Sequence, residues 1–369
     1  MNRTEILLSD SRKLIYFDER PGLDRHFPDQ RNLPPFAACS ELRWDPLTGR
    51  WVVIAGHRQE RIHLPLESQC PLCPSTDSNL TEIPAPDYDV VVFENRFPAL
   101  HSEGAHIPEP SGTAGLFAAS GLASGTCEVI CFTSEHHSSF SQLIPARARL
   151  IVEVWCDRTK ELSIREEIQQ VFCFENRGEE IGVTEPHPHG QVYAYPFMAP
   201  RMQQMITQMN EYRSESGHNL FDDLIESERL QGHRIVTESD HWISFVPFAP
   251  RWPYEIHLYP KRRVPYLPEL NTSEKDDLAL IYLDLLKRFD ILFDEPAPYI
   301  SAWHQYSNED LLDEYALHLE LFTIRRANHK LKYLAGSEAA MEVFIGDVIP
   351  ENAAQTLREL RPDFNPTQK

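Results

Sequence analysis

The sequence has no long hydrophobic run and no excess of basic residues. No apolar segment of the 369 residues approaches the length of a membrane span, and the first residues do not combine a basic segment with an apolar core. Lysine and arginine number 35 against 56 aspartates and glutamates, a formal net charge of -21. Nucleic acid and anionic membranes bind basic surfaces. We therefore expect a cytoplasmic protein with neither partner, in which local positive charge meets any anionic substrate.

Cysteine is too sparse for a disulfide framework. The seven cysteines are an odd number spread along a long chain, which favours burial or metal ligation. Two of them form Cys70-Pro-Leu-Cys73, a spacing at which two thiolates can share one metal ion. A redox pair is the alternative, but prolines flank the segment and the βαβ pattern of such motifs is missing. The motif predicts half of a metal site, with the remaining ligands supplied from elsewhere.

The most informative stretch spans residues 184–197 and reads TEPHPHGQVYAYPF. Its alternating prolines favour extended backbone, so His187 and His189 should point to the same side of a strand-like segment. Gly190 allows backbone to approach a ligand closely, and the alternation beyond it predicts a continuing strand. A proline-stiffened loop with solvated histidines is the alternative, which the clustering of the two imidazoles disfavours. The stretch predicts a chemical site.

Other candidate ligand-binding side chains stand where predicted strands end. A hairpin at residues 41–54 is followed by Arg58 and Arg61, close enough in sequence to face one ligand, although a solvated loop is the alternative. Three further strands lead to polar residues: the strand from residue 89 to Asn95 and Arg96, strand 128–132 to His136 and His137, and strand 170–174 to Asn176-Arg177-Gly178. These side chains are candidates for a shared site.

The order of elements repeats in the second half of the chain. Strands are predicted at residues 242–246, 254–259 and 299–303, and a helix from Ser273 to about residue 293. Ser273 and Asp276 form a capping-box pattern at the start of this helix. The segment LHLELF then occupies the place that the paired histidines hold in the first half. The pattern indicates an internal duplication in which only the first copy keeps both histidines.

With these motifs the chain resembles the galactose-1-phosphate uridylyltransferase family of the histidine triad superfamily, from about residue 43 to residue 346. The matching segments are DPLTGRW, the CxxC motif, FENRFPAL, FENRG, HPHGQ and KYLAGSE. The resemblance implies an α+β fold: a duplicated histidine-triad-like fold with an antiparallel sheet and flanking helices in each half. It also implies a homodimer whose subunits complete each other's active sites. We expect an N-terminal arm at 1–39, a domain with the nucleophile and zinc site at 40–200, and a C-terminal domain at 201–369.

The resemblance also implies an activity, the exchange of UMP between UDP-glucose and galactose 1-phosphate. The family's nucleophile falls at His189, whose attack on phosphorus would give a uridylyl-histidine and divide one transfer into two easier steps. Gln191 would stabilise phosphoryl charge without delivering a proton, and hydrolytic relatives carry histidine at that position. An adenylyl-transferring or nucleotide-hydrolysing relative is the alternative. A non-enzymatic nucleotide-binding or zinc-stabilised module is a third hypothesis.

Residue-for-residue matching to the family gives the expected ligand-binding residues. Uridylyl contacts fall at Arg58, Arg61, Phe93, Asn95, Asn176, Gly182, Thr184 and Gln191, and hexose-phosphate contacts at Lys332, Tyr333 and Glu338. Structural zinc would be held by Cys70, Cys73, His136 and His187, a closed tetrahedral set. A candidate second metal site offers only His304, His318 and Glu320, because Met205 stands where the family has a glutamate. A thioether is a poor ligand for zinc or ferrous iron, so we expect this metal to be absent or weakly held.

Overall fold

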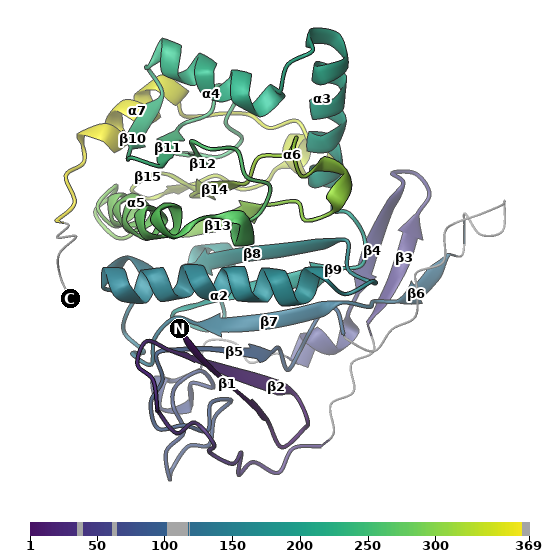
Figure 1. Ribbon diagram of the computed structural model, residues 1–369, viewed down its shortest axis with the longest axis vertical. Helices are drawn as coiled ribbons and strands as arrows, with labels where there is room; N and C mark the ends of the chain where they lie inside the picture. Colours follow the sequence, from purple (N-terminus) through teal and green to yellow (C-terminus); the bar gives the residue numbers. More distant parts are fainter. Residues whose placement is uncertain (35–39, 61–64, 102–116, 118, 364–369) are drawn as a thin grey trace. The chain divides into compact units, whose positions relative to one another are not determined.

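The computed structural model describes residues 1–34, 40–60, 65–101, 117 and 119–363. The chain divides into two compact units made of interleaved segments. The first comprises Met1–His137, Val154–Cys173 and His187–Gln204, and the second Ser138–Glu153, Phe174–Pro186 and Met205–Lys369. Antiparallel strands and helices make up each unit (Figure 1), which confirms the expected α+β fold.

The main sheet of the first unit has the strand order β1-β2-β5-β7-β9. These strands are β1 (Asn2–Leu7), β2 (Lys13–Asp18), β5 (Val90–Glu94), β7 (Thr126–Cys131) and β9 (His189–Tyr195), and all neighbours are antiparallel. Within the segment expected to be an N-terminal arm, β1 and β2 form a hairpin that belongs to this sheet. The segment's helix- and strand-breaking prolines, Pro21, Pro28, Pro34 and Pro35, all lie after β2.

The two faces of this sheet have different coverings. In β9, Gly190, Val192 and Ala194 are buried, whereas the residues that alternate with them, from His189 to Tyr195, are half-buried. Glu128 of β7 lies opposite Val192, on the face away from His189. There Arg158, from the part of α2 (Pro145–Ser163) that belongs to this unit, contacts both carboxylate oxygens of Glu128 at 2.8 Å. Helix α2 thus anchors one face and leaves the histidine-bearing face to other segments.

A small three-stranded sheet of the first unit has the order β4-β3-β6. Strands β3 (Glu41–Asp45) and β4 (Arg50–Ile54) form the predicted hairpin, and β6 (Ser120–Leu122) adds to β3. Asp45 Oδ1 accepts from the Leu47 amide at 3.0 Å, and Gly49 has a φ of 65°, which explains why this turn carries these residues. The short helices η1 (Gly56–Glu60) and η2 (Glu67–Gln69) follow, and η2 leads directly into Cys70.

The second unit contains β8 and α3 only from Phe174 and Met205 onward, respectively, and is organised around strands in the order β8-β13-β14-β12-β11-β10. They are β8 (Gln170–Arg177), β13 (Tyr299–His304), β14 (His318–Phe322), β12 (Ile256–Pro260), β11 (Trp242–Phe245) and β10 (Ile235–Glu238). Its helices are α3 (Pro200–Ser216), α4 (Leu220–Gln231), α5 (Thr272–Asp290), α6 (Gly336–Met341) and α7 (Pro350–Glu359), and β15 (Arg325–Ala327) pairs with β16 (Lys330–Leu331). The remaining turns of 3-10 helix are η3 (Phe140–Gln142), η4 (Glu179–Ile181), η5 (Leu267–Glu269) and η6 (Glu309–Leu311). The strands predicted in both halves are present, which supports the duplication.

Helix α5 begins slightly earlier than its sequence pattern predicts. The capping box consists of Asn271 and Glu274 rather than Ser273 and Asp276: Asn271 Oδ1 accepts from the Glu274 amide at 3.0 Å, and Glu274 Oε2 accepts from the Asn271 amide at 2.8 Å. An asparagine is an equally good N-cap, and both candidate pairs have the required spacing. Leu278, like Ile281 and Leu285 further along, is buried as predicted.

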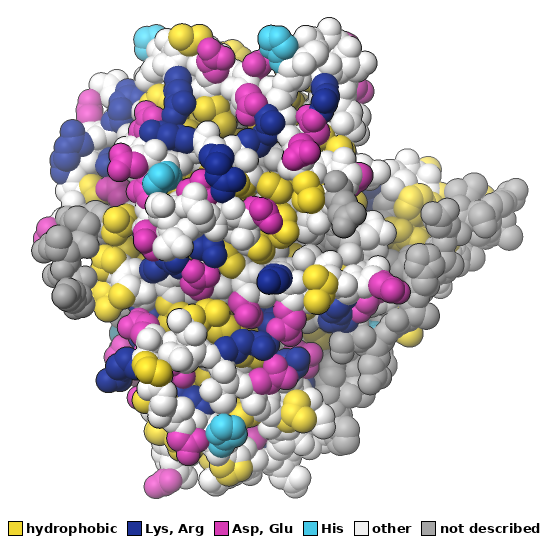
Figure 2. Space-filling view, in the orientation of Figure 1, with side chains coloured by type: hydrophobic (Ala, Val, Ile, Leu, Met, Phe, Trp, Pro, Cys, Tyr) yellow, Lys and Arg dark blue, Asp and Glu magenta, His cyan; other side chains and the backbone are white. Residues whose placement is uncertain are grey.

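No helix among the described residues is long and apolar enough to cross a membrane. On the face shown in Figure 2, Lys and Arg side chains are interspersed with Asp and Glu side chains rather than gathered into one basic area. Local charge pairing, not a large single-sign field, characterises this surface of the described chain.

Candidate active site and metal centre

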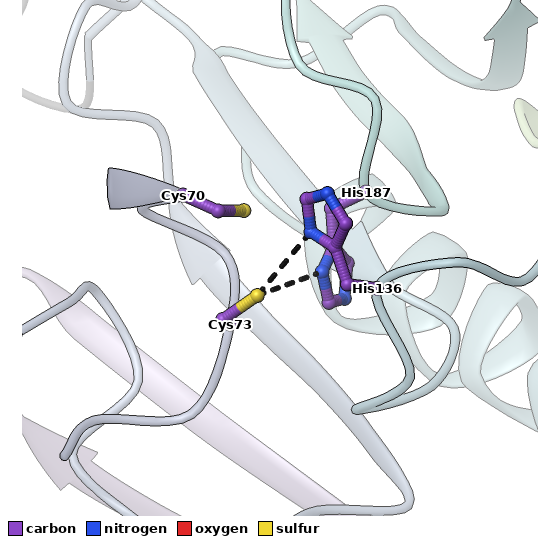
Figure 3. A group of neighbouring side chains, drawn as sticks. All are labelled: Cys70, Cys73, His136 and His187. Carbon is purple, nitrogen blue, oxygen red and sulfur yellow. Dashed lines mark hydrogen bonds between the residues drawn. The ribbon is translucent and has the colours of Figure 1, made fainter. Parts of the chain in front are cut away.

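Four side chains from three segments of the first unit converge on one point (Figure 3). Cys70 and Cys73 come from the turn after η2, His136 from the loop after β7, and His187 from the residues before β9. The Cys73 Sγ lies 3.3 Å from His136 Nδ1 and 3.5 Å from His187 Nδ1, and all four ligand atoms lie within 4.8 Å of one another. Tetrahedral zinc, with bonds of about 2.3 Å to sulfur and about 2.0–2.1 Å to nitrogen, places such atoms about 3.5 Å apart. The arrangement fits a metal ion.

The ring of His187 is held in the tautomer that metal binding requires. Its Nε2 lies 2.8 Å from the carbonyl oxygen of Thr133, which can only accept, so Nε2 carries the proton and Nδ1 carries the lone pair. Burial lowers the pKa of His187 to about 4, so the ring is neutral near pH 7. Burial likewise raises the pKa of the Cys70 thiol to about 12. A bound cation would supply the charge that stabilises the thiolate.

His189, two residues further on, is oriented by the same segment. Its Nδ1 donates to the backbone carbonyl of His187 at 2.8 Å, so the neutral ring has its lone pair on Nε2. As the first residue of β9 it is half-buried, opposite Cys131 of β7, and Gln191 is on the same face opposite Val129. A neutral imidazole with a fixed tautomer at a strand end can act as a nucleophile.

Positive charge reaches this face from η1. Arg58 is half-buried, and its Nη1 lies 3.5 Å from the hydroxyl of Tyr193, which alternates onto the same side of β9 as His189. Its guanidinium is therefore available to the face that bears the histidine, as an anionic phosphate requires. Arg61, predicted to act with it, lies outside the described residues.

Two predicted contacts take structural positions at the floor of this face. Phe93 of β5 is 3% exposed and packs into the hydrophobic cluster that contains Cys70, Val129 and Cys131. Asn95 directly follows β5: its backbone amide donates to the Cys127 carbonyl at 2.8 Å and its Oδ1 accepts from the Phe97 amide at 2.8 Å. Asn95 is half-buried, whereas Phe93 shapes the core beneath the site more than its surface.

The remaining predicted substrate residues belong to the second unit. Asn176 and Thr184 are half-buried, and Gly182 has a φ of 83° with open space where a side chain would begin. Lys332 Nζ lies 3.1 Å from Glu338 Oε1 and also donates to the Ile345 carbonyl, so these two charged residues pair with each other. The neighbouring Tyr333 is 73% exposed.

A second group of possible metal ligands lies on one face of the second unit's sheet. His304, His318 and Glu320 lie within ligand-sharing distance, and Glu255 and His257 form another such group with the same Glu320. The Glu320 carboxylate accepts a hydrogen bond from the Arg251 guanidinium at 3.0 Å. The same carboxylate lies 3.3 Å from His304 Nε2. His318 donates from Nδ1 to the Ala316 carbonyl at 2.9 Å, the same local bond that His189 makes to His187. Met205 accepts a hydrogen bond from Tyr315 at its sulfur, 3.6 Å away.

Comparison with known proteins assigns the chain to a family. Family models of the N-terminal and C-terminal domains of galactose-1-phosphate uridyl transferase match residues 36–199 and 205–367. The chain belongs to the galactose-1-phosphate uridylyltransferase family. It is 44% identical to the galactose-1-phosphate uridylyltransferase of Streptomyces lividans over 98% of each chain, and 36% identical to that of Thermotoga maritima over 86% of this chain and 98% of the relative. A solved structure of uridylyltransferase matches with a TM-score of 0.75 and 29% identity, covering 86% of this chain and 97% of the other.

In this uridylyltransferase-family chain, several residues of the Cys70 ligand group and of the Glu320 ligand group could not be predicted from the sequence. Thr133 and Tyr88 hold the His187 ring, yet each is a single polar residue without a motif. Glu255 and His257 join Glu320 because β12 pairs with β14 so that His257 lies opposite Glu320. Their period-two spacing is visible in the sequence, but the pairing register is not.

Proposed function

We propose that this chain is a UDP-glucose–hexose-1-phosphate uridylyltransferase that transfers UMP from UDP-glucose to galactose 1-phosphate. The observation that carries the proposal is the orientation of His189, whose Nδ1 donates to the His187 carbonyl and whose Nε2 is therefore the nucleophilic nitrogen. Family membership supports the substrate pair, because the relatives at 44% and 36% identity are galactose-1-phosphate uridylyltransferases. Galactose metabolism in the cytoplasm is the corresponding role.

In the first half-reaction, His189 Nε2 attacks the α-phosphorus of UDP-glucose. The N–P bond forms, the bond from that phosphorus to the bridging oxygen breaks, and glucose 1-phosphate leaves with the electron pair. In the second, a phosphate oxygen of galactose 1-phosphate attacks the same phosphorus, the N–P bond breaks and UDP-galactose is released. The imidazole carries positive charge while uridylylated, which strengthens the Nδ1–H bond to the His187 carbonyl. Gln191 donates to a phosphoryl oxygen and Arg58 offers its guanidinium.

The remaining substrate roles follow the family pattern. Uridylyl binding is assigned to Arg58, Arg61, Phe93, Asn95, Asn176, Gly182, Thr184 and Gln191, and hexose-phosphate binding to Lys332, Tyr333 and Glu338. Because Lys332 and Glu338 are 6% and 7% exposed and bonded to each other, they would have to exchange this ion pair for substrate. Exposed apolar side chains around them suit a contact with a second copy, and we assign the working form to a homodimer.

Zinc is the metal we assign to Cys70, Cys73, His136 and His187. Two thiolates and two imidazoles in a closed set suit Zn²⁺, and the hydrogen bond from His187 Nε2 to the Thr133 carbonyl supports the required tautomer. Bound there, zinc would supply structural cross-linking rather than a reactive position, since all four ligands come from the protein. The protein's part is to hold the His187 backbone, whose carbonyl orients His189.

The decisive experiment mixes the protein with UDP-glucose and each of several sugar 1-phosphates, and identifies the nucleotide sugar that appears. UDP-galactose formed only with galactose 1-phosphate is the expected result. Matched reactions with UDP-glucose and with ADP-glucose, each without an acceptor, measure the release of UMP or AMP. Rapid release of free nucleotide, or transfer from ADP-glucose in preference, would replace the proposal with a hydrolytic or adenylyl-transferring activity.

A further inference from the structure

Tyr88 lies between the cysteine loop, residues 70–73, and the segment that leads into β9, which carries His189. No sequence motif marks this tyrosine. It lies just before β5, is 3% exposed and belongs to the hydrophobic cluster that contains Cys70 and Cys131. Its hydroxyl donates to the carbonyl of Leu72, between the two metal-ligand cysteines, at 2.9 Å. The same oxygen lies 2.8 Å from Nε2 of His187.

The hydrogen positions in this group follow from the donors and acceptors available. The carbonyls of Leu72 and Thr133 can only accept, and a tyrosine hydroxyl has one proton. Because the proton of Tyr88 goes to Leu72, the tyrosine oxygen accepts from His187, whose Nε2 proton is shared with Thr133 at 2.8 Å. The thiol of Cys131 also contacts this hydroxyl. This is the arrangement that leaves His187 Nδ1 with its lone pair directed at the metal-ligand group.

The bonds continue to the reacting nitrogen. Leu72 is bonded to Tyr88, Tyr88 to the ring of His187, and the carbonyl of His187 to Nδ1 of His189. We propose that Tyr88 is a positioning residue that fixes the cysteine loop and the His187 ring to one oxygen atom, and so sets both the retention of the metal and the alignment of His189. The inference rests on the zinc assignment proposed above.

Tyr16 provides a matched control within the same hydrophobic cluster. It is 0% exposed, and its hydroxyl accepts one backbone hydrogen bond, from the Ala85 amide at 3.2 Å. Tyr88→Phe and Tyr16→Phe therefore each remove one buried hydroxyl with a backbone partner, but only the first removes a contact with a metal ligand. Outer-shell partners of metal ligands typically change affinity or activity by about 10–100-fold.

The test measures metal content, the rate of zinc transfer to a chromogenic chelator, and steady-state kinetics for wild type and both variants. For Tyr88→Phe we expect zinc release at least about tenfold faster and a lower kcat with KM little changed, because substrate contacts remain while the nucleophile is misaligned. Tyr16→Phe should have the wild-type zinc-release rate and kcat. Thermal unfolding of both variants checks that they lose similar stability.

The outcomes separate the two ideas. Wild-type protein that purifies without a tightly held metal would overturn the zinc assignment, and the Tyr88 inference with it. Wild-type protein that holds one zinc, with equal release rates and equal kcat in Tyr88→Phe and wild type, would overturn the Tyr88 inference alone. The same shift in both variants would show a general effect of core hydroxyls and would also refute the specific role.

Discussion

Two ring nitrogens and one carbonyl carry the chemistry at the residue scale. Nδ1 of His189 donates a hydrogen bond to the His187 carbonyl, which leaves Nε2 as the nucleophilic nitrogen. Replacing His189 by alanine removes this nucleophile and leaves the metal ligands in place. His189→Ala should lose transfer completely, and wild type incubated with UDP-glucose alone should acquire an acid-labile uridylyl group on one residue. Double-reciprocal plots of the initial rate against one substrate, at several fixed concentrations of the other, should give parallel lines. Intersecting lines without an adduct would contradict the assignment.

The amide of Gln191 gives a second residue-scale prediction. It lies on the half-buried face of β9 with His189 and cannot act as a general acid, so the covalent intermediate should persist in water. Gln191→His should increase the release of UMP without acceptor and decrease transfer, measured in parallel by chromatography of the nucleotides. Release at the wild-type level would show that the amide has another role.

Glu175 predicts a pH dependence of stability. This carboxyl of β8 is 5% exposed and accepts a hydrogen bond from the Tyr299 hydroxyl at 2.8 Å. Burial raises its pKa from 4.5 to about 7. The native state thus keeps its proton more tightly than the unfolded state. The resulting stability is fully present below about pH 4.5 and is lost as the pH rises through about 7.

Glu175→Gln removes this titration while keeping a neutral side chain of the same size. Between about pH 5 and about pH 8, wild type should lose about 2 kcal/mol of unfolding free energy more than the variant. Urea unfolding at both pH values measures the difference. An equal pH response in the two proteins would show that Glu175 is ionised in the native state or titrates normally in it.

Which residues the sequence could reveal depends on whether their partners are local. His187 and His189 share a strand end that the alternating prolines predict, and the CxxC spacing predicts two ligands without any fold. The bonds from Tyr88 and Thr133 to His187 span 99 and 54 residues, so they depend on strand pairing that spacing cannot show. The contact between Phe93 and substrate stays a prediction from the family pattern, and the almost complete burial of Phe93, which β5 and β7 set by pairing, could not be predicted from that pattern.

At the scale of elements, strands were predictable where alternation is strong and misjudged where prolines dominate the neighbourhood. The β3–β4 hairpin follows from its turn residues, and β14 from its place in the repeat. The β1–β2 hairpin was overlooked because four later prolines set the character of the segment. For α5, two overlapping capping patterns differed by two residues, and only the backbone direction at Asn271 decides between them.

The turn after η2 carries the element-scale prediction. The Cys73 sulfur lies 3.3 Å from His136 Nδ1 and 3.5 Å from His187 Nδ1, so the ligand group joins the turn to the segment before β9. Cys73→Ser should therefore lower metal content, thermal stability and transfer activity together, because metal binding and local folding are coupled. His318→Ala, in the second unit's cluster, should cost less activity. Full activity in metal-free Cys73→Ser would refute the coupling.

At the scale of the whole molecule, the segment after β16 exposes several large apolar side chains. They are Tyr333, Leu334, Met341, Val343, Ile345 and Ile349, each between 49% and 73% exposed. Contiguous exposed apolar groups commonly mark a surface that another chain covers. This segment also contains Lys332 and Glu338, which the family pattern assigns to hexose phosphate.

We predict that light scattering and sedimentation will give twice the chain mass. The double substitution Met341→Asp and Val343→Asp should shift the protein toward monomer and reduce transfer, because charge would be placed in the surface that we assign to contact with a second copy. Leu230→Asp, at an 81% exposed position of α4, is the matched control and should leave the assembly unchanged. A wild-type monomer with full activity would contradict the expectation that two subunits complete each other's active sites.

The parallel between His189 and His318 has a consequence for how the two copies diverged. Each histidine is fixed by a bond from Nδ1 to the carbonyl two residues before it, and each is followed two residues later by a side chain of nearly the same shape, Gln191 or Glu320. The exchange of an amide NH2 for a carboxylate oxygen reverses the sign of the ligand that the strand end attracts. Of these two equivalent strand ends, the one that carries Gln191 therefore suits an anionic phosphate, whereas the one that carries Glu320 suits a positively charged neighbour such as Arg251.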